Sequence, residues 1–296
     1  MKVAIATSFY ESGRDFLADY AKAVAGAAQG RDLRIIAAVD DLRNPEATLR
    51  SALGPWPVTL VDRVDGAGIP EVRGRMLCAS AVSDADMVVF IDMDDMIESG
   101  AISRHAQAIE EVDFSYGDLQ PVDSKGRILG PTFFEGAKIP ERVTSSDDIL
   151  LRNFLGFSNT AIRPTAIDRA ACDPPKHAIA VDWWVFATLA DLGRKGARAD
   201  GVVAKYRQHD GNTLGASASV APEALRRRCE IVTSHLDSLT PNPRRRRAAE
   251  RVARVSEALR LGKVGPASLK SVDARGAWFE EVARLVDLLE GPDHGE

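Results

Sequence analysis

The sequence predicts an α/β fold, with a mostly parallel central sheet flanked by helices over residues 1–220 and a helical extension over residues 221–296. Short apolar runs alternate with helical patterns along the first third of the chain, and such alternation indicates crossover units with parallel strands. Acidic residues follow two of the apolar runs, at the strand ends where ligands bind in sheets of this kind. From Pro222 onward we find only helical patterns.

The first half of the sheet is predicted from four apolar runs, which are separated by two helical patterns. Each run is bounded by polar or turn-forming residues, as buried strands usually are. In chain order, these elements are the strand VAIAT (3–7), the helix RDFLADYAKAVAGAAQ (14–29), the strands LRIIAAV (33–39) and VTLV (58–61), the helix VRGRMLCASAV (72–82) and the strand MVVFI (87–91).

The middle of the chain has shorter and more varied patterns. The turn residues DSKG indicate a hairpin, and Ser145 and Asp148 have the spacing of a capping box. A proline and a glycine then mark the ends of a strand and of an amphipathic helix. The predicted elements are the hairpin 114–134, a helix starting at Ser145, the strand NTAIRP (159–164), the amphipathic helix DWWVFATLADLG (182–193) and the strand GVVAKYRQH (201–209).

Composition and charge argue against several classes of protein. The chain has 296 residues, 45% hydrophobic and 27% charged, as in ordinary soluble proteins. A net charge of −5 argues against nucleic acid as a partner, and no apolar run reaches the roughly 18 residues of a membrane span. The start MKVAIATSFY is interpreted as a strand rather than a signal peptide. Three cysteines fit neither a disulfide framework nor a zinc site, so we expect a cytoplasmic protein; they are Cys78, Cys172 and Cys229.

A basic run, PRRRR at residues 243–247, opens one of the C-terminal helical patterns. Such a run suits contact with phosphate or with an anionic membrane surface, but a solvated helix start is the simpler interpretation. The extension itself would pack against the first domain, pair two copies of the chain or dock the protein on a membrane.

The stretch ADMVVFIDMDDMIESG places three carboxylates, Asp92, Asp94 and Asp95, directly after the fourth predicted strand. Ionised carboxylates repel one another in a dry site unless a counter-charge is present. Three of them within four residues therefore indicate a bound cation, and oxygen ligands favour Mg²⁺ or Mn²⁺ together with a substrate phosphate. The alternative is an acidic loop in which Asp95 or Ser99 caps the following helix.

The segment FIDMDD, with VRGRMLCASA before it, resembles the Asp-x-Asp region of family 2 glycosyltransferases, which have the GT-A fold with a Rossmann-like sheet. Four further segments are similar to those of the family and follow in its order up to residue 215. The resemblance implies a metal-dependent, inverting glycosyltransferase that uses a nucleotide-sugar, with UDP as the expected nucleotide. The four segments are YGDLQPVD, FLGFSNTAIRP, VDWWVFATLADLG and AKYRQHDGNTLG.

The resemblance also implies roles for residues on the donor side. Asp94 would bind one divalent cation, Mn²⁺ or Mg²⁺, that bridges the diphosphate, and Asp92 would contact the ribose or the metal. His209 would contact the metal or a phosphate, while a structural role for it is equally open. A cation here would neutralise the charge that develops on the departing nucleoside diphosphate.

Residues after the first two predicted strands are implied to hold the nucleotide. Thr7 and Phe9 would lie near the base with the ring of Phe9 stacked on it, and burial of Phe9 in the core is the alternative. Asp40 would accept a hydrogen bond from uracil or ribose. Arg73 and Arg75 both match an arginine of the family, and we prefer Arg75 for its spacing to the metal motif.

On the acceptor side, the resemblance implies that Asp182 is the general base that takes the proton from the attacking hydroxyl, with inversion at the anomeric carbon. Asp182 would alternatively, or in addition, cap the helix that follows it. Val181 stands where the family has an acidic residue. Asn159 and Trp183 are the expected contacts to a carbohydrate or lipid-linked acceptor.

Other nucleotide-binding functions fit the sequence less well. A sugar nucleotidyltransferase would need a glycine-rich basic loop after the first strand, and ATSFYESGRD has one glycine there. The sequence has no Walker-type or Gly-x-Gly-x-x-Gly motif, which argues against ATPase and dinucleotide-binding functions. A degenerate protein that binds UDP and metal without turnover stays open as an alternative, as does assembly into a homo-oligomer.

Overall fold

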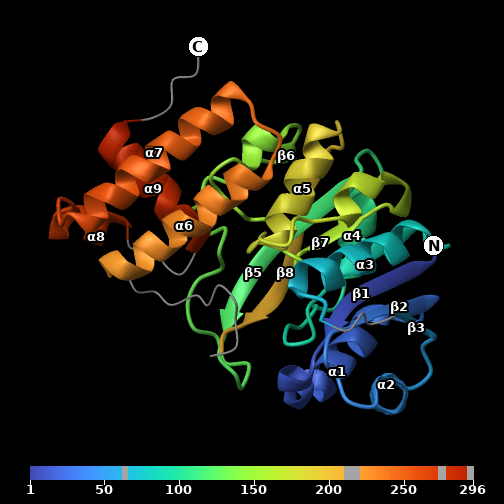
Figure 1. Ribbon diagram of the computed structural model, residues 1–296. Helices are drawn as coiled ribbons and strands as arrows, with labels where there is room; N and C mark the ends of the chain where they lie inside the picture. Colours follow the sequence, from blue (N-terminus) through green and yellow to red (C-terminus); the bar gives the residue numbers. More distant parts are fainter. Residues whose placement is uncertain (62–65, 210–220, 273–277, 292–296) are drawn as a thin grey trace.

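The computed structural model describes residues 1–61, 66–209, 221–272 and 278–291. Within these ranges, eight strands form one sheet in the order β3-β2-β1-β4-β7-β5-β8-β6, with helices flanking it (Figure 1). All of these strands except β6 and β7 run in the same direction. The mostly parallel sheet expected from the sequence is therefore confirmed.

The first half of the sheet contains the four parallel strands β1 to β4, and every residue of β1 and β4 is buried. These strands lie where the apolar runs predict them, because continuous apolar runs suit parallel strands that are buried on both faces. The short helices η1 and α2 add to the predicted elements. The bounds are β1 Val3–Phe9, the 3₁₀ helix η1 Glu11–Phe16, α1 Leu17–Ala28, β2 Leu33–Val39, α2 Pro45–Leu53, β3 Val58–Val61, α3 Ile69–Ala81, β4 Met87–Phe90 and α4 Ala101–Ala108.

The second half of the sheet mixes strand directions. Strand β7 is antiparallel to both β4 and β5 and thereby joins the two halves. Strand β8 is parallel to β5, and the short strand β6 closes the edge. The bounds are β5 Phe114–Val122, β6 Arg142–Val143, the 3₁₀ helix η2 Ser146–Ile149, β7 Thr160–Ile162, the 3₁₀ helices η3 Pro164–Ala166 and η4 Arg169–Cys172, α5 Val181–Asp191 and β8 Gly196–Arg207.

Three elements of the structure differ in kind or extent from those predicted from the sequence. The second arm of the hairpin after β5 is reduced to one bridge between Val122 and Ile128. The capping box of Ser145 and Asp148 is present but begins only the 3₁₀ turn η2. Helix α5 is buried on nearly all sides rather than amphipathic, because aromatic side chains of the sheet and of the C-terminal helices pack against it from different sides.

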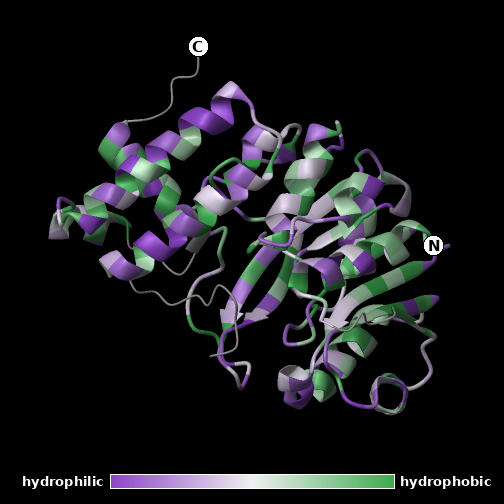
Figure 2. Ribbon diagram, in the orientation of Figure 1, coloured by the Kyte–Doolittle hydropathy of each residue, from purple (hydrophilic) through white to green (hydrophobic). Residues whose placement is uncertain are grey.

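The C-terminal extension packs beside α5 in the structure (Figure 1). Its first three helices each begin at a proline, whose fixed backbone angle suits the first helical turn. Hydrophilic and hydrophobic residues alternate along α6 and α7, as expected of helices with one exposed face (Figure 2). No helix among the described residues combines the length and the apolar character that crossing a membrane requires. The bounds are α6 Pro222–Ser238, α7 Pro243–Arg260, α8 Pro266–Val272 and α9 Trp278–Glu290.

The basic run at the start of α7 connects the extension to the rest of the protein. Arg245 is almost fully buried, and its guanidinium lies 2.6 Å from the carboxylate of Asp191 and 2.6 Å from the hydroxyl of Ser146. Arg244, whose side chain is about half exposed, forms a second ion pair with Asp147 at 2.6 Å. At least two arginines of the run therefore bind groups of the same chain.

We predict that Arg245→Ala lowers the free energy of unfolding by about 2–4 kcal/mol, because Asp191 and Ser146 would lose a buried charged partner. Arg244→Ala, the matched control, should cost less than about 1 kcal/mol, since its ion pair is half exposed. Urea unfolding of both variants measures the difference. Equal effects of the two substitutions would contradict this assignment.

Candidate functional site

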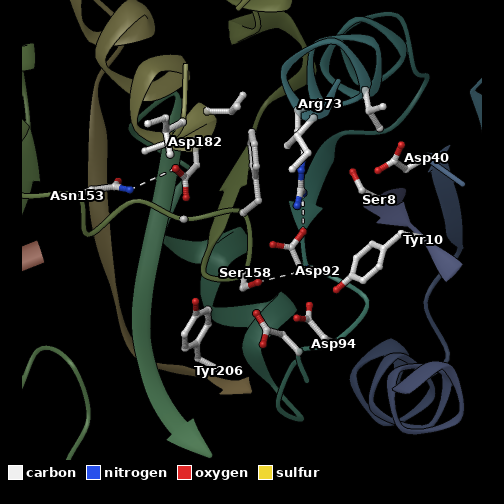
Figure 3. Close-up of a pocket in the computed structure, with 18 of the residues that line it drawn as sticks. Ser8, Tyr10, Asp40, Arg73, Asp92, Asp94, Asn153, Ser158, Asp182 and Tyr206 are labelled. Carbon is white, nitrogen blue, oxygen red and sulfur yellow. Dashed lines mark hydrogen bonds and ion pairs between the residues drawn. The ribbon is translucent and has the colours of Figure 1, made fainter. Parts of the chain in front are cut away.

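A cavity of about 350 Å³ opens beyond the carboxyl ends of β1, β2 and β4. Its walls come from both halves of the sheet (Figure 3). Ser8, Tyr10 and Asp40 line it on one side, the acidic residues after β4 lie at its base, and Asp182 faces it from helix α5. The cavity therefore lies where parallel sheets of this kind bind their ligands.

Asp92, Asp94 and Asp95 form an acidic cluster directly after β4. One carboxylate oxygen from each lies within 4.8 Å of the others. Burial and the charge of Asp94 raise the pKa of Asp92, although Arg73 opposes this, and burial together with both neighbours raises the pKa of Asp95 well above its usual value. Such a cluster gains stability from a cation that offsets the repulsion among its carboxylates.

Each carboxylate of the acidic cluster also has a partner in the protein. A guanidinium nitrogen of Arg73 lies 2.5 Å from Asp92. Nε2 of His209 lies 2.9 Å from Oδ2 of Asp94, and because an ionised carboxylate only accepts hydrogen bonds, the imidazole is the donor. His209 is thus close to the expected metal ligands, and in this arrangement it orients Asp94.

Arg207, which sequence reasoning did not select, fixes the loop that carries the acidic cluster. Its backbone N–H donates to Asp95 at 2.7 Å, and its Nε donates to the backbone carbonyl of Asp94 at 2.8 Å. The guanidinium also pairs with Asp19 and lies 4.6 Å from the ring centre of Phe16. The signal was available, since Arg207 is the arginine of the quoted segment AKYRQH.

The structure places Arg73 at the cavity, and the preference for Arg75 is corrected. Arg73 lines the cavity, whereas Arg75 is absent from its wall and lies 3.7 Å from Glu71 on the same helix. Two residues along a helix correspond to a rotation of about 200° about its axis, so Arg73 and Arg75 point to nearly opposite sides. Only one of them can face Asp92. Spacing counted along the sequence missed this rotation.

The expected contacts to the base, Thr7 and Phe9, lie in the core and not at the cavity. Both are fully buried: Phe9 packs edge-on against Tyr20, and the Thr7 hydroxyl is hydrogen-bonded to the Tyr20 hydroxyl at 2.6 Å. Ser8 and Tyr10 line the cavity instead. Successive side chains of a strand point to opposite faces, so the alternation along β1 separates these two pairs.

Tyr10 reaches the acidic cluster from the end of β1 (Figure 3). Its hydroxyl points toward Asp94, and burial together with the charges of Asp94 and Asp92 raises the pKa of Tyr10. Gly13 makes room for the ring, because a Cβ at this position would lie 2.6 Å from it. Asp40, directly after β2, lines the same side of the cavity.

Asp182 lies in the first turn of α5 and faces the cavity from the side opposite Asp40 and Tyr10 (Figure 3). The side-chain amide of Asn153 donates a hydrogen bond to its Oδ1 at 3.2 Å, and the N–H of Trp183 donates to the same oxygen at 2.7 Å. Burial raises the pKa of Asp182 to about 6. The helix is preceded by Ala180 at the N-cap, so Asp182 is not the N-cap residue.

The two residues expected to contact an acceptor lie away from the cavity. The side chain of Asn159 is buried and bonds to backbone groups of Gly156, Gly117 and Phe154. Trp183 is 1% exposed, and its indole N–H donates to a backbone carbonyl. Neither residue lines the cavity, whereas Asn153 does. The last part of the segment AKYRQHDGNTLG, residues 210–215, lies outside the described residues.

The fold of this chain is similar to that of two proteins whose structures were solved with a bound nucleotide-sugar. S. aureus TarS 1–349, in its crystal structure with UDP-GlcNAc, is similar to this chain with a TM-score of 0.57 and 16% identity, over 98% of this chain and 84% of that one. The mannosyltransferase PcManGT from Pyrobaculum calidifontis, in complex with GDP-Man and Mn²⁺, has a TM-score of 0.57 and 12% identity, over 100% and 88%. No protein-family model and no curated protein sequence matches the chain. At these identities the likeness establishes the fold.

We predict that Asp182→Asn stabilises the protein, and that the gain grows with pH. A folded-state pKa of about 6, raised from 3.8, means that the ionised form of Asp182 costs stability as the pH rises through this range. Asparagine carries no such cost, so the gain should be about 1 kcal/mol at pH 4.5 and about 3 kcal/mol at pH 7.5. Urea unfolding at both values tests this, and a gain that does not depend on pH would contradict it.

Proposed function

We propose that the protein is a metal-dependent glycosyltransferase that moves a sugar from a nucleotide-sugar, with UDP as the expected nucleotide, to an acceptor hydroxyl with inversion. One observation carries the proposal: the acidic cluster and Asp182 face the same cavity from different sides (Figure 3). A group that binds a cation–diphosphate and a base for the acceptor are the two components that this reaction needs. The fold, shared with TarS and PcManGT, supports the proposal.

The acidic cluster fits a hard divalent cation, Mn²⁺ or Mg²⁺. Its donors are all carboxylate oxygens, and the raised pKa values of Asp92 and Asp95 reflect burial and repulsion that a cation would relieve. Asp94 and Asp92 are the proposed ligands, and His209 would hold Asp94 in place. When bound, the cation would neutralise charge on the diphosphate and so favour its departure.

The other side of the cavity is proposed to hold the nucleotide. Ser8 lies near the end of β1, Tyr10 follows β1 and Asp40 follows β2, so these side chains line one wall next to the acidic cluster. Arg73 adds a positive charge between this wall and Asp182 (Figure 3). Its guanidinium suits a pyrophosphate oxygen, and a bound phosphate would compete with Asp92 for it.

Asp182 is proposed to act as the base. As the acceptor oxygen bonds to the anomeric carbon, its proton passes to the Asp182 carboxylate, and the bond from the anomeric carbon to the diphosphate oxygen breaks. A pKa of about 6 leaves most of the carboxylate ionised at neutral pH while making it more basic than an ordinary aspartate. The hydrogen bond from Asn153 holds one of its oxygens.

We predict that UDP and Mn²⁺ together raise the melting temperature, because ligands that bind only the folded state stabilise it by mass action. Asp94→Asn should abolish this rise. Asp200→Asn is the matched control, since Asp200 is an exposed aspartate whose partner is Arg198. The same screen with GDP and other nucleoside diphosphates identifies the nucleotide of the donor. If UDP and Mn²⁺ raise the melting temperature of Asp94→Asn as much as that of the wild type, the acidic cluster is not the metal site.

Asp182→Asn is predicted to lower the rate of sugar transfer by about 10²- to 10⁴-fold, the usual contribution of a general base, while leaving UDP–Mn²⁺ binding intact. Wild-type transfer should also fall below pH 6, where Asp182 takes up a proton. Release of the nucleoside diphosphate measures turnover, and it tests the effect of the substitution as well as the effect of pH. Binding of UDP and Mn²⁺ without turnover, across a panel of donors and acceptors, would instead favour the degenerate binding protein.

A further inference from the structure

We infer that the C-terminal helices position Asp182 for its reaction, with His235 of α6 and Glu280 of α9 as the positioning residues. The inference rests on the proposed role of Asp182 as the base. It assigns to the extension a task in the catalytic site, in addition to its contribution to stability. Three sets of contacts lead to it.

The first set fixes the start of α5, next to Asp182. The ring of Trp183 is stacked on the imidazole of His235, with ring centres 3.8 Å apart and planes 12° from parallel. The indole N–H of Trp184 donates to the backbone carbonyl of Ser238, at the end of α6, at 3.2 Å. Both residues that follow Asp182 in the chain are therefore held by helix α6.

The second set fixes the other end of α5. Asp191, its last residue, pairs with the buried Arg245 at 2.6 Å. Arg245 also binds Ser146 of η2, the 3₁₀ turn whose Ile149 carbonyl accepts the indole N–H of Trp183. Because α6 and α7 thus contact α5 at its two ends, a shift of the extension would rotate or tilt the helix that carries Asp182.

The third set reaches Asp182 through Asn153. The amide of Asn153 donates to Asp182, and the preceding residue, Arg152, pairs with Glu280 at 2.9 Å. Glu280 is only 2% exposed, which makes this a mostly buried ion pair between α9 and the loop that carries Asn153. The extension therefore contacts Trp183, which follows Asp182 in the chain, and Arg152, which precedes the residue that donates to Asp182.

His235 acts through the shape of its ring. It is 4% exposed, burial lowers its pKa to about 3, and neither ring nitrogen has a hydrogen-bond partner among the described residues. The imidazole is therefore neutral at working pH and offers Trp183 a flat surface and no hydrogen bond. A phenyl ring can take over this contact, whereas a methyl group cannot.

The test compares His235→Ala with His235→Phe in the full-length protein. Three readouts are used: turnover, UDP–Mn²⁺ binding, and hydrogen exchange of the amides at residues 181–186. We expect His235→Ala to lower kcat about 10-fold or more, since displacements of about 1 Å in a catalytic site cost up to about 100-fold. UDP–Mn²⁺ binding should stay within about twofold of wild type, because α6 does not line the donor wall. Exchange at 181–186 should become faster, and His235→Phe should restore both kcat and protection.

Glu280→Gln is the second variant, in case His235→Ala does not fold. It should lower kcat in the same way, while Arg254→Ala, which removes an exposed ion pair within the extension, should not. The inference would be overturned if His235→Ala left kcat and hydrogen exchange at residues 181–186 unchanged. It would also be overturned if His235→Phe lost as much kcat as His235→Ala. If wild-type protein transfers no sugar, the proposed function fails, and hydrogen exchange still decides whether the extension holds the start of α5.

Discussion

The burial of three carboxylates at the end of one strand is the interaction on which the rest of the site depends. β4 is fully buried, so the residues that follow it leave the core at the base of the cavity with little solvent around them. Repulsion and desolvation there demand hydrogen-bond donors and positive charge. The protein supplies the guanidinium of Arg73, the imidazole of His209 and the backbone N–H of Arg207 from two distant segments. The same electrostatic demand makes the cluster suitable for a divalent cation.

The fold brings these partners together because of the order of its strands. β4 lies between β1 and β7, so the acidic cluster meets Tyr10 on one side and the second half of the sheet on the other. β8 then returns parallel to β5 and delivers Arg207 and His209 to the same place. Helix α5 lies between the sheet and the C-terminal helices (Figure 1), and its Asp182 faces the cavity (Figure 3). The extension is therefore close to the chemistry although it follows the sheet in sequence.

The sequence was sufficient for the parallel sheet and for placing four aspartates at one cavity, since each follows a strand or lies in the first turn of a helix whose pattern is strong; they are Asp40, Asp92, Asp94 and Asp182. It also placed His209 near the acidic cluster, where the structure has it beside Asp94. It was insufficient where the direction of a side chain decides. Phe9 and Tyr10 are adjacent, as are Trp183 and Asp182, and only packing shows which of each pair faces the cavity. Arg73 and Asn153 required knowledge of the helix rotation and of a loop path that no local pattern encodes.

The most direct test of the central claim is anomalous diffraction at the manganese edge from crystals grown with Mn²⁺ and UDP. We expect one strong peak bounded by the carboxylates of Asp92 and Asp94, with the diphosphate on its open side and the base toward Asp40 and Tyr10. A peak elsewhere, or a bound nucleotide with no metal at the end of β4, would contradict it.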